Sequence, residues 1–221
     1  MPSASSLDAV TVDAMGTLVE LDDTPGRLRA ALAARGIERS RDEVKAAFGA
    51  EVAYYLPRTL EGADEESLSD LRRRCTAVFL EHARAELDPE SFAPAFAEAI
   101  VFRPLAGARE ALLRLRNAGL ALACVSNWDI SLGPQLERTR LRAAFAEIVS
   151  SAEAGAAKPD PAVFAVALER LDVAADRALH IGDGGNDREG AAAAGLAFEP
   201  VPLATLPERL GLGAGPWSRR P

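Results

Sequence analysis

Cysteines, long apolar runs and a leader-like start are scarce or missing in this sequence of 221 residues. Its two cysteines, Cys75 and Cys124, lie far apart, among apolar residues and without the spacing of metal ligands. We therefore expect buried free thiols in a reducing cytoplasm. No apolar run approaches the roughly 18 residues of a membrane span. The first residues form neither a basic nor an apolar region, so we expect no signal peptide.

An excess of positive charge is also missing. The chain has 33 acidic and 25 basic residues, which gives a net charge of −8. An acidic surface disfavours general binding to nucleic acids or to anionic membranes. An anionic substrate therefore requires a local basic patch or a metal ion that overcomes this background.

Strand patterns and helical patterns alternate in most of the chain. Small and β-branched residues at 9–12 predict a buried strand that ends at Asp13, before a turn at Gly16. Further strands are predicted at 120–125, 148–150, 178–182 and 196–199, with helical patterns between them at 108–118, 131–140, 161–171 and 188–194. This alternation predicts βαβ units in a parallel sheet. We expect an α/β, Rossmann-like core made of residues 1–21 and 98–221, with a loose surface segment at 211–221.

The stretch between the first two strands is helical throughout. Thr24 and Pro25 are typical of a helix start, with Thr24 as the N-cap. Helical patterns cover 26–35, 42–56, 67–87 and 88–99. We predict that residues 22–97 form a separate helical bundle, inserted after the first strand.

Polar residues follow four of the strands. These are Asp13, Ser126 with Asn127, Lys158, and Asp183 with Asp187. The carboxyl ends of parallel strands meet at one edge of a sheet, where such folds bind their ligands. Three carboxylates there would repel one another unless a cation lies between them, and oxygen ligands suit Mg²⁺. A lysine, a hydroxyl and an amide beside that ion are the donors that a phosphoryl group needs.

These residues resemble the four motifs of the haloacid dehalogenase-like (HAD) superfamily of hydrolases. The first motif is similar to residues 13–18, the second to Ser126-Asn127, the third to residues 158–161 and the fourth to residues 182–187. The motifs occur in the family's order and on the expected kinds of element. The helical stretch resembles the cap domain that the family inserts after the first motif.

The resemblance implies a role for each residue. Asp13 would be the nucleophile that forms an aspartyl-phosphate. Mg²⁺ would be bound by Asp13, the backbone carbonyl of Met15, Asp183 and Asp187, with Asp187 holding metal waters or orienting Lys158. The phosphoryl oxygens would be held by Ser126, Asn127 and backbone amides, and Lys158 would neutralise charge. The partner would be a small phosphorylated metabolite, and the protein a monomer or a homodimer.

One position departs from the family's phosphatases. They usually carry a second aspartate two residues after the nucleophile, which protonates the leaving group and then activates water. Met15 stands there and cannot transfer a proton, so we expect slow turnover of alkyl phosphates and faster turnover of aryl or acyl phosphates. Substitutes for the acid are available at Glu20, Asp22, Asp23 and Asp129.

This departure leaves two other functions open. The 2-haloacid dehalogenases of the superfamily also lack that aspartate, use the nucleophile on carbon and need no metal. Asp183 and Asp187 argue against this reading, because a metal-free pocket gains little from such carboxylates. The third possibility is a fold that binds a phosphorylated ligand or a partner without significant turnover.

Both histidines have a structural interpretation. His180 lies inside a predicted buried strand, which favours a hydrogen-bonded core position. His82 falls on the apolar stripe of the predicted helix at 67–87, which favours packing.

Overall fold

The computed structural model describes residues 6–212, and the chain divides into two compact units. One unit contains the chain up to Glu20 and from Pro104 onward, and the other contains Leu21–Arg103. The helical unit thus begins one residue before the predicted insertion and ends six residues after it. The loose segment expected at 211–221 falls mainly outside the described residues.

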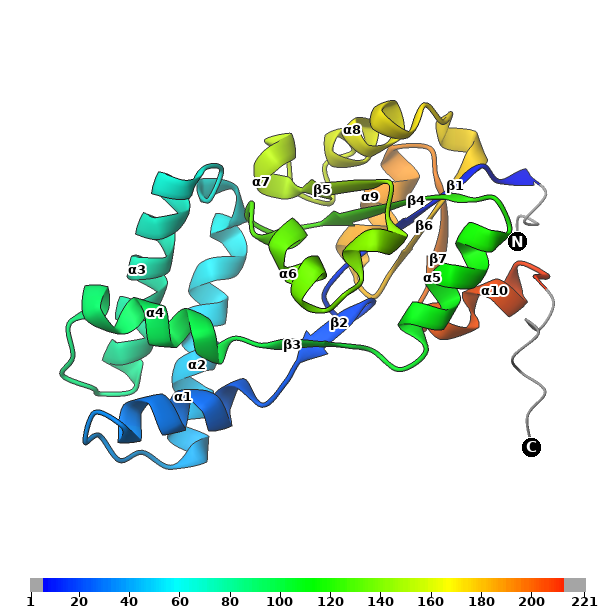
Figure 1. Cartoon of the computed structure of the whole chain (residues 1–221). Helices are drawn as coiled ribbons and strands as arrows, with labels where there is room; N and C mark the ends of the chain where they lie inside the picture. Colours follow the sequence, from blue (N-terminus) through cyan, green and yellow to red (C-terminus); the bar gives the residue numbers. More distant parts are fainter. Residues whose placement is uncertain (1–5, 213–221) are drawn as a thin grey trace, which may run out of the picture. The chain divides into compact units, whose positions relative to one another are not determined.

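A five-stranded parallel sheet forms the first unit (Figure 1). Its strands are β1 (Ala9–Val12), β4 (Ala121–Ser126), β5 (Glu147–Ser150), β6 (Ala178–Gly182) and β7 (Ala197–Pro200), in the order β5-β4-β1-β6-β7. All four residues of β1 are buried, as the small and β-branched sequence predicts. The predicted α/β fold with a parallel sheet is therefore confirmed.

Helices cover this sheet (Figure 1). They are α5 (Ala108–Asn117), α6 (Leu132–Arg138), α7 (Ser151–Ala154), α8 (Ala162–Leu171), α9 (Gly185–Ala193) and α10 (Leu206–Arg209), with short 3-10 turns η3 (Arg142–Ala144), η4 (Ala175–Arg177) and η5 (Leu203–Thr205). Phe164 of α8 and Ala191 of α9 share a buried cluster with Ala9, Ala123 and Val125 of the sheet. This packing fixes the central strands, whose ends carry the polar residues.

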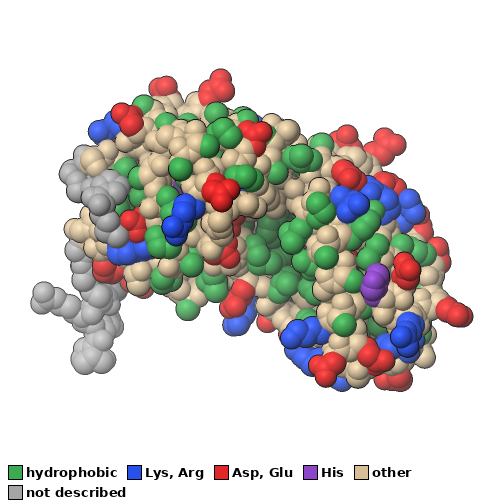
Figure 2. Space-filling view, turned by 180° about the vertical axis from the view of Figure 1, so that it is seen from behind, with side chains coloured by type: hydrophobic (Ala, Val, Ile, Leu, Met, Phe, Trp, Pro, Cys, Tyr) green, Lys and Arg blue, Asp and Glu red, His purple; other side chains and the backbone are tan. Residues whose placement is uncertain are grey.

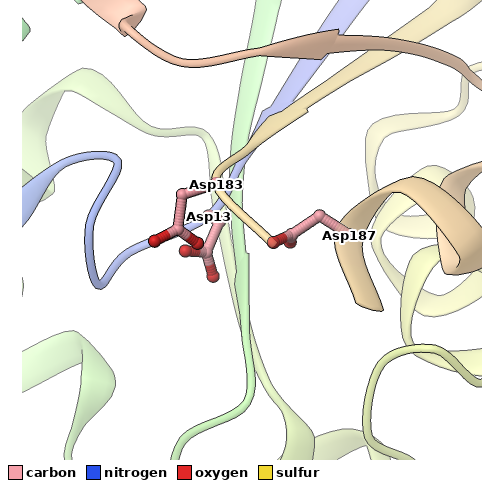
Figure 3. Close-up of side chains that lie close together, drawn as sticks. All are labelled: Asp13, Asp183 and Asp187. Atoms are coloured by element: carbon pink, nitrogen blue, oxygen red, sulfur yellow. The ribbon is translucent and has the colours of Figure 1, made fainter. Parts of the chain in front are cut away.

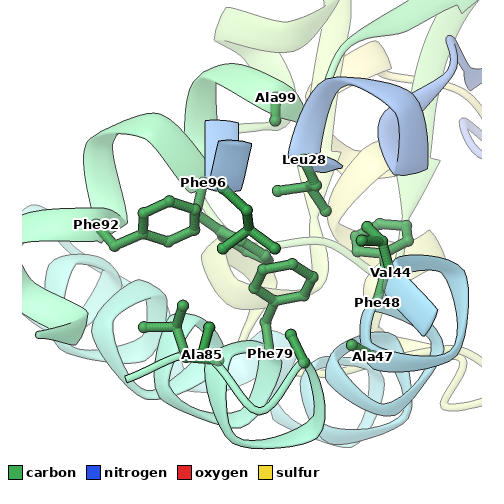
Figure 4. Close-up of a cluster of buried hydrophobic side chains, with 12 residues drawn as sticks. Leu28, Val44, Ala47, Phe48, Phe79, Ala85, Phe92, Phe96 and Ala99 are labelled. Carbon is green, nitrogen blue, oxygen red and sulfur yellow. The ribbon is translucent and has the colours of Figure 1, made fainter. Parts of the chain in front are cut away.

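The second unit is a helical bundle. It contains α1 (Thr24–Ala33), α2 (Arg41–Tyr55), the 3-10 turn η2 (Leu56–Glu61), α3 (Glu65–His82) and α4 (Pro89–Ala99). At its centre the Phe79 ring stacks on Phe92 and packs at a tilt against Phe96, with Leu28 and Phe48 in the same cluster (Figure 4). Large aromatic side chains supply most of the buried apolar area in such a small core.

Several helix ends differ from the sequence prediction, and local caps explain three of them. The N-cap of α1 is Asp23 and not Thr24, because the Asp23 side chain accepts a hydrogen bond from the backbone N–H of Gly26. Helix α3 begins at Glu65, since Asp64 and Ser67 form a reciprocal capping box. It ends at His82, and Arg84 then takes a left-handed conformation with φ of 50°. A local cap thus decides each boundary.

Two short strands were not predicted. β2 (Val19–Leu21) and β3 (Phe102–Pro104) pair with each other in a separate two-stranded sheet. The sequence pattern predicts a turn around residue 102. The strand was not recognised there because three residues are too few to show an alternating pattern. The division between the two units falls within these strands.

His82 is exposed, so the packing role predicted for it is wrong. The buried stripe of α3 follows steps of four residues, from Leu71 through Cys75 and Phe79 to the C-cap Ala83. His82 lies beside this stripe, and its Nδ1 is 2.9 Å from the carbonyl oxygen of Val78. Both cysteines are buried thiols and neither forms a disulfide, as predicted.

The surface carries both signs of charge. Figure 2 shows acidic and basic side chains interspersed over the face in view. Among residues 6–212, no helix combines the length and the apolar character needed to cross a membrane.

A buried carboxyl group on α2 leads to a prediction about stability. Burial raises the pKa of Glu51 to about 7, although its hydrogen bond with Cys75 acts in the opposite direction. The folded state therefore favours the protonated carboxyl, and stability is lost as the pH rises from about 4.5 through 7. We expect Glu51→Gln to raise the free energy of unfolding by up to about 3 kcal/mol at pH 8.5 and by little at pH 4.5. Urea denaturation at the two pH values measures this difference.

The matched control is Glu98→Gln, which alters an exposed glutamate on α4. It should change stability little at either pH. An equal effect of Glu51→Gln at both pH values would contradict the assignment of a buried, titrating carboxyl.

Candidate active site

The polar residues predicted from the sequence lie at the carboxyl edge of the sheet. Asp13 follows β1, Ser126 is the last residue of β4, and Asp183 follows β6. Strand β1 is central, and the chain adds β4 and β5 on one side of it before β6 and β7 on the other. Such a reversal of strand order opens a crevice at the carboxyl ends, where open α/β sheets bind ligands.

Three carboxylates converge at this edge of the sheet (Figure 3). Asp13, Asp183 and Asp187 each offer an oxygen atom, and these atoms lie within 4.8 Å of one another. Asp13 and Asp187 are buried, whereas Asp183 is exposed. The cluster therefore has one open side and two acidic groups shielded from water.

Lys158 partly balances this negative charge. Its Nζ lies 2.5 Å from Oδ1 of Asp13 and 2.5 Å from Oδ1 of Asp187, and it donates to the carbonyl oxygen of Val125 at 3.1 Å. Burial alone would lower the pKa of Lys158, but the two carboxylates outweigh it and raise that pKa. The lysine is therefore a fixed positive charge that joins Asp13 to Asp187.

The last residue of β4 and the residue that follows it have different partners. Ser126 donates from Oγ to Oδ1 of Asp13 at 2.9 Å. Asn127 instead contacts the backbone of Lys158: its Nδ2 donates to the carbonyl oxygen at 2.9 Å, and its Oδ1 accepts from the N–H at 2.7 Å. This bidentate contact holds the loop that carries Lys158, whereas the resemblance implied a phosphoryl contact for Asn127.

Two glycines allow the acidic groups to approach the backbone. A Cβ on Gly16 would lie 2.1 Å from Oδ2 of Asp183, and one on Gly182 would lie 2.3 Å from Cγ of Asp187. Gly16 also has a φ of 77°, which favours glycine. The glycines of the first and fourth motifs therefore make room for the carboxylates.

Asp187 is surrounded by hydrogen-bond donors. Its Oδ1 accepts from Lys158 and lies 2.9 Å from Nε2 of His180, and its Oδ2 accepts from the N–H of Gly184 at 3.0 Å. Burial would raise the pKa of Asp187, but the hydrogen bond from His180 and the charge of Lys158 hold it well below its usual range. Asp187 is therefore ionised at neutral pH.

The donor set fits a magnesium ion. Lys158 contacts one oxygen each of Asp13 and Asp187, and the cluster also contains the exposed carboxylate of Asp183. Partial burial raises the pKa of Asp183, and the negative charges of Asp13 and Asp187 raise it further. Negative charge is thus in excess around Asp183. A divalent cation relieves such an excess, and carboxylate oxygens are ligands that Mg²⁺ accepts.

Three of the residues considered as substitutes for the acid have partners of their own. Asp22 pairs with Arg27, and the hydrogen bond with Arg41 lowers the pKa of Asp23. Asp129 is buried and accepts from the N–H of Ser131 at 2.7 Å. Met15 itself, two residues after Asp13, is 37% exposed.

Two side chains of this region were not predicted from the sequence as parts of the site. Thr17 is buried, and its Oγ1 lies 3.5 Å from Oδ2 of Asp13. Its place within the first motif was the available signal. His180 was expected in the core and is fully buried there, but its contact with Asp187 has no signal in the sequence.

Comparison with known proteins agrees with this arrangement. A family model described as haloacid dehalogenase-like hydrolase matches residues 7–195. The chain belongs to this family. Across 202 residues it is 31% identical to a phosphoglycolate phosphatase of Nitrosospira multiformis, covering 89% of this chain and 83% of that protein.

Shorter matches and solved structures extend the comparison. The chain is 39% identical to the bovine haloacid dehalogenase-like hydrolase domain-containing protein 3, but the match spans only 45% of that protein's length. The magnesium-bound HAD-hydrolase YfnB of Bacillus subtilis superposes with a TM-score of 0.71 at 20% identity, covering 93% of this chain and 99% of that one. The L-2-haloacid dehalogenase of Xanthobacter autotrophicus gives a TM-score of 0.66 at 25% identity, covering 95% and 85%. The YfnB match shows the fold alone.

Proposed function

We propose that this hydrolase is a magnesium-dependent phosphatase that acts on a small phosphorylated metabolite through an aspartyl-phosphate on Asp13. The observation that carries the proposal is the contact of Asp13 with Lys158 and Ser126 beside the acidic cluster. A nucleophilic carboxylate, a fixed cation and an oxygen-donor metal site are the parts that phosphoryl transfer requires.

Each residue has a defined task in this reaction. An oxygen of Asp13 attacks phosphorus, and the leaving oxygen departs with the electron pair of the broken P–O bond and takes up a proton. Lys158 and Ser126, which contact Asp13 in the structure, stabilise the charge that develops on the phosphoryl oxygens. Water then attacks phosphorus, which releases phosphate and restores Asp13.

Asp13, Asp183, Asp187 and the backbone carbonyl of Met15 would hold the metal ion. Bound Mg²⁺ neutralises charge on the phosphoryl group and orients it for attack. Asp187 orients Lys158 as well, through the contact of its Oδ1 with Nζ.

The phosphoglycolate phosphatase relative suggests where to begin with substrates. We propose small phosphorylated carboxylic acids as the first class to examine. The helical unit, Leu21–Arg103, would act as the cap that selects among them, as the family resemblance implies.

Met15 leads to a prediction about the leaving group. We expect Met15→Asp to raise the turnover of alkyl phosphates about tenfold or more, because it supplies the proton donor that the position lacks. Turnover of p-nitrophenyl phosphate should change much less, since its leaving group needs little protonation. Steady-state kinetics on both substrates measure the ratio.

The control is Met15→Asn, which has a similar size and shape to aspartate but carries no acidic proton. It should leave the ratio of alkyl to aryl turnover unchanged. If Met15→Asp leaves alkyl-phosphate turnover where it was, the missing acid is not what limits this enzyme.

One screen tests the proposed function against its alternatives. Phosphorylated metabolites and p-nitrophenyl phosphate are assayed with and without Mg²⁺, and 2-chloropropionate is assayed for release of chloride. Mg²⁺-dependent phosphate release is the expected result. Metal-independent chloride release would establish a dehalogenase instead, a function that Met15 and the dehalogenase neighbour favour. No product in any of these assays would favour a protein that binds a phosphorylated ligand or a partner without significant turnover.

A further inference from the structure

His180 occupies the middle of the sheet beneath the acidic cluster. It lies on β6 opposite Thr11 of β1 and has no exposed surface. The Phe164 ring packs edge-on against it, with ring centroids 4.8 Å apart, and Phe198 lies at 6.3 Å. An imidazole in such apolar surroundings needs hydrogen-bond partners for both nitrogen atoms.

Both nitrogens of His180 have partners. Nε2 lies 2.9 Å from Oδ1 of Asp187, and Nδ1 lies 2.8 Å from the Thr11 hydroxyl and 3.1 Å from the Thr11 carbonyl oxygen. An ionised carboxylate can only accept, so Nε2 carries the proton of that hydrogen bond. In the neutral ring, Nδ1 then accepts from the Thr11 hydroxyl.

We propose that His180 is a positioning residue, which is held by Thr11 and fixes the carboxylate of Asp187 so that Lys158 is aimed at Asp13. The chain of contacts runs without a gap from Thr11 through His180, Asp187 and Lys158 to Asp13. Oδ1 of Asp187 is shared by His180 and Lys158, which leaves Oδ2 toward Gly184. The catalytic consequence rests on the proposed function, because it assumes that Lys158 serves phosphoryl transfer.

Two variants separate positioning from packing. His180→Leu keeps an apolar side chain in the pocket and removes the N–H, whereas His180→Gln retains an N–H donor. Positioning predicts that His180→Leu lowers kcat about 10–100-fold with little change in KM, the size of effect typical of groups that orient active-site ligands. His180→Gln should recover at least about half of that loss on a logarithmic scale. Packing alone predicts the reverse order, because leucine suits an apolar pocket better than glutamine.

Spectroscopy of the unaltered protein gives a test that does not depend on activity. Long-range ¹H–¹⁵N correlation on the histidine-labelled protein shows which ring nitrogen of His180 is protonated, with His82→Gln used to assign the two histidines. A proton on Nε2 supports the proposal, and a bare Nε2 overturns it. If the protein hydrolyses no phosphate ester, the proposed function fails but this result still stands. If Asp13→Asn is inactive and His180→Leu is more active than His180→Gln, only the inference about His180 fails.

Discussion

Replacing Asp13 with asparagine is expected to lower phosphatase turnover by at least about 10³–10⁴-fold, the usual cost of removing a nucleophile. The amide can still accept a hydrogen bond from Ser126, but it cannot attack phosphorus or carry the charge that pairs with Lys158. Turnover of p-nitrophenyl phosphate at saturating Mg²⁺ measures the loss.

Asp176→Asn is the matched control, because it makes the same chemical change at an exposed position on η4. It should leave turnover near that of the unaltered enzyme. Survival of activity in Asp13→Asn would show that Asp13 is not the nucleophile.

Replacing Lys158 with methionine is expected to reduce both turnover and stability. The side chain is 3% exposed and neutralises the buried carboxylates of Asp13 and Asp187. Removing one member of a buried ion pair costs about 3–5 kcal/mol of stability, because it leaves a buried charge without compensation. We expect this loss in the absence of metal, together with a fall in turnover of about 10³-fold.

Magnesium should restore part of the stability of Lys158→Met. The ion replaces the lost positive charge among the same carboxylates, so it should raise the Tm of the variant more than that of the unaltered protein. Lys45→Met is the control, since Lys45 is the only other lysine and is exposed. Equal Tm shifts with Mg²⁺ in Lys158→Met and in the unaltered protein would contradict a shared electrostatic site.

The sequence predicted the five-stranded sheet better than the short strands β2 and β3 and the helix ends. β1, β4 and β6 are mainly apolar runs that are buried almost throughout, and such runs identify parallel strands. β2 and β3 have only three residues each, so no periodicity can develop. The starts of α1 and α3 were displaced because the caps at Asp23 and Asp64 decide these two boundaries.

The candidate site was predictable because each strand end carries its own local signal. Asp13, Ser126 and Asp183 follow apolar runs, and parallel pairing brings them to one edge. The partner of Asn127 could not be predicted, since its contact with the backbone of Lys158 depends on how two loops meet. The contacts of His180 could not be predicted either, because its neighbour Thr11 lies 169 residues away in the sequence.

The most direct test of the account is to trap the acyl phosphate. The enzyme is mixed with substrate and Mg²⁺, quenched in acid and reduced with borohydride, which converts an aspartyl-phosphate into homoserine. We predict homoserine at position 13 in the peptide mass spectrum, dependent on substrate. An unmodified Asp13 in an enzyme that is turning over, or homoserine at another aspartate, would contradict the assignment of Asp13 as the residue that accepts the phosphoryl group.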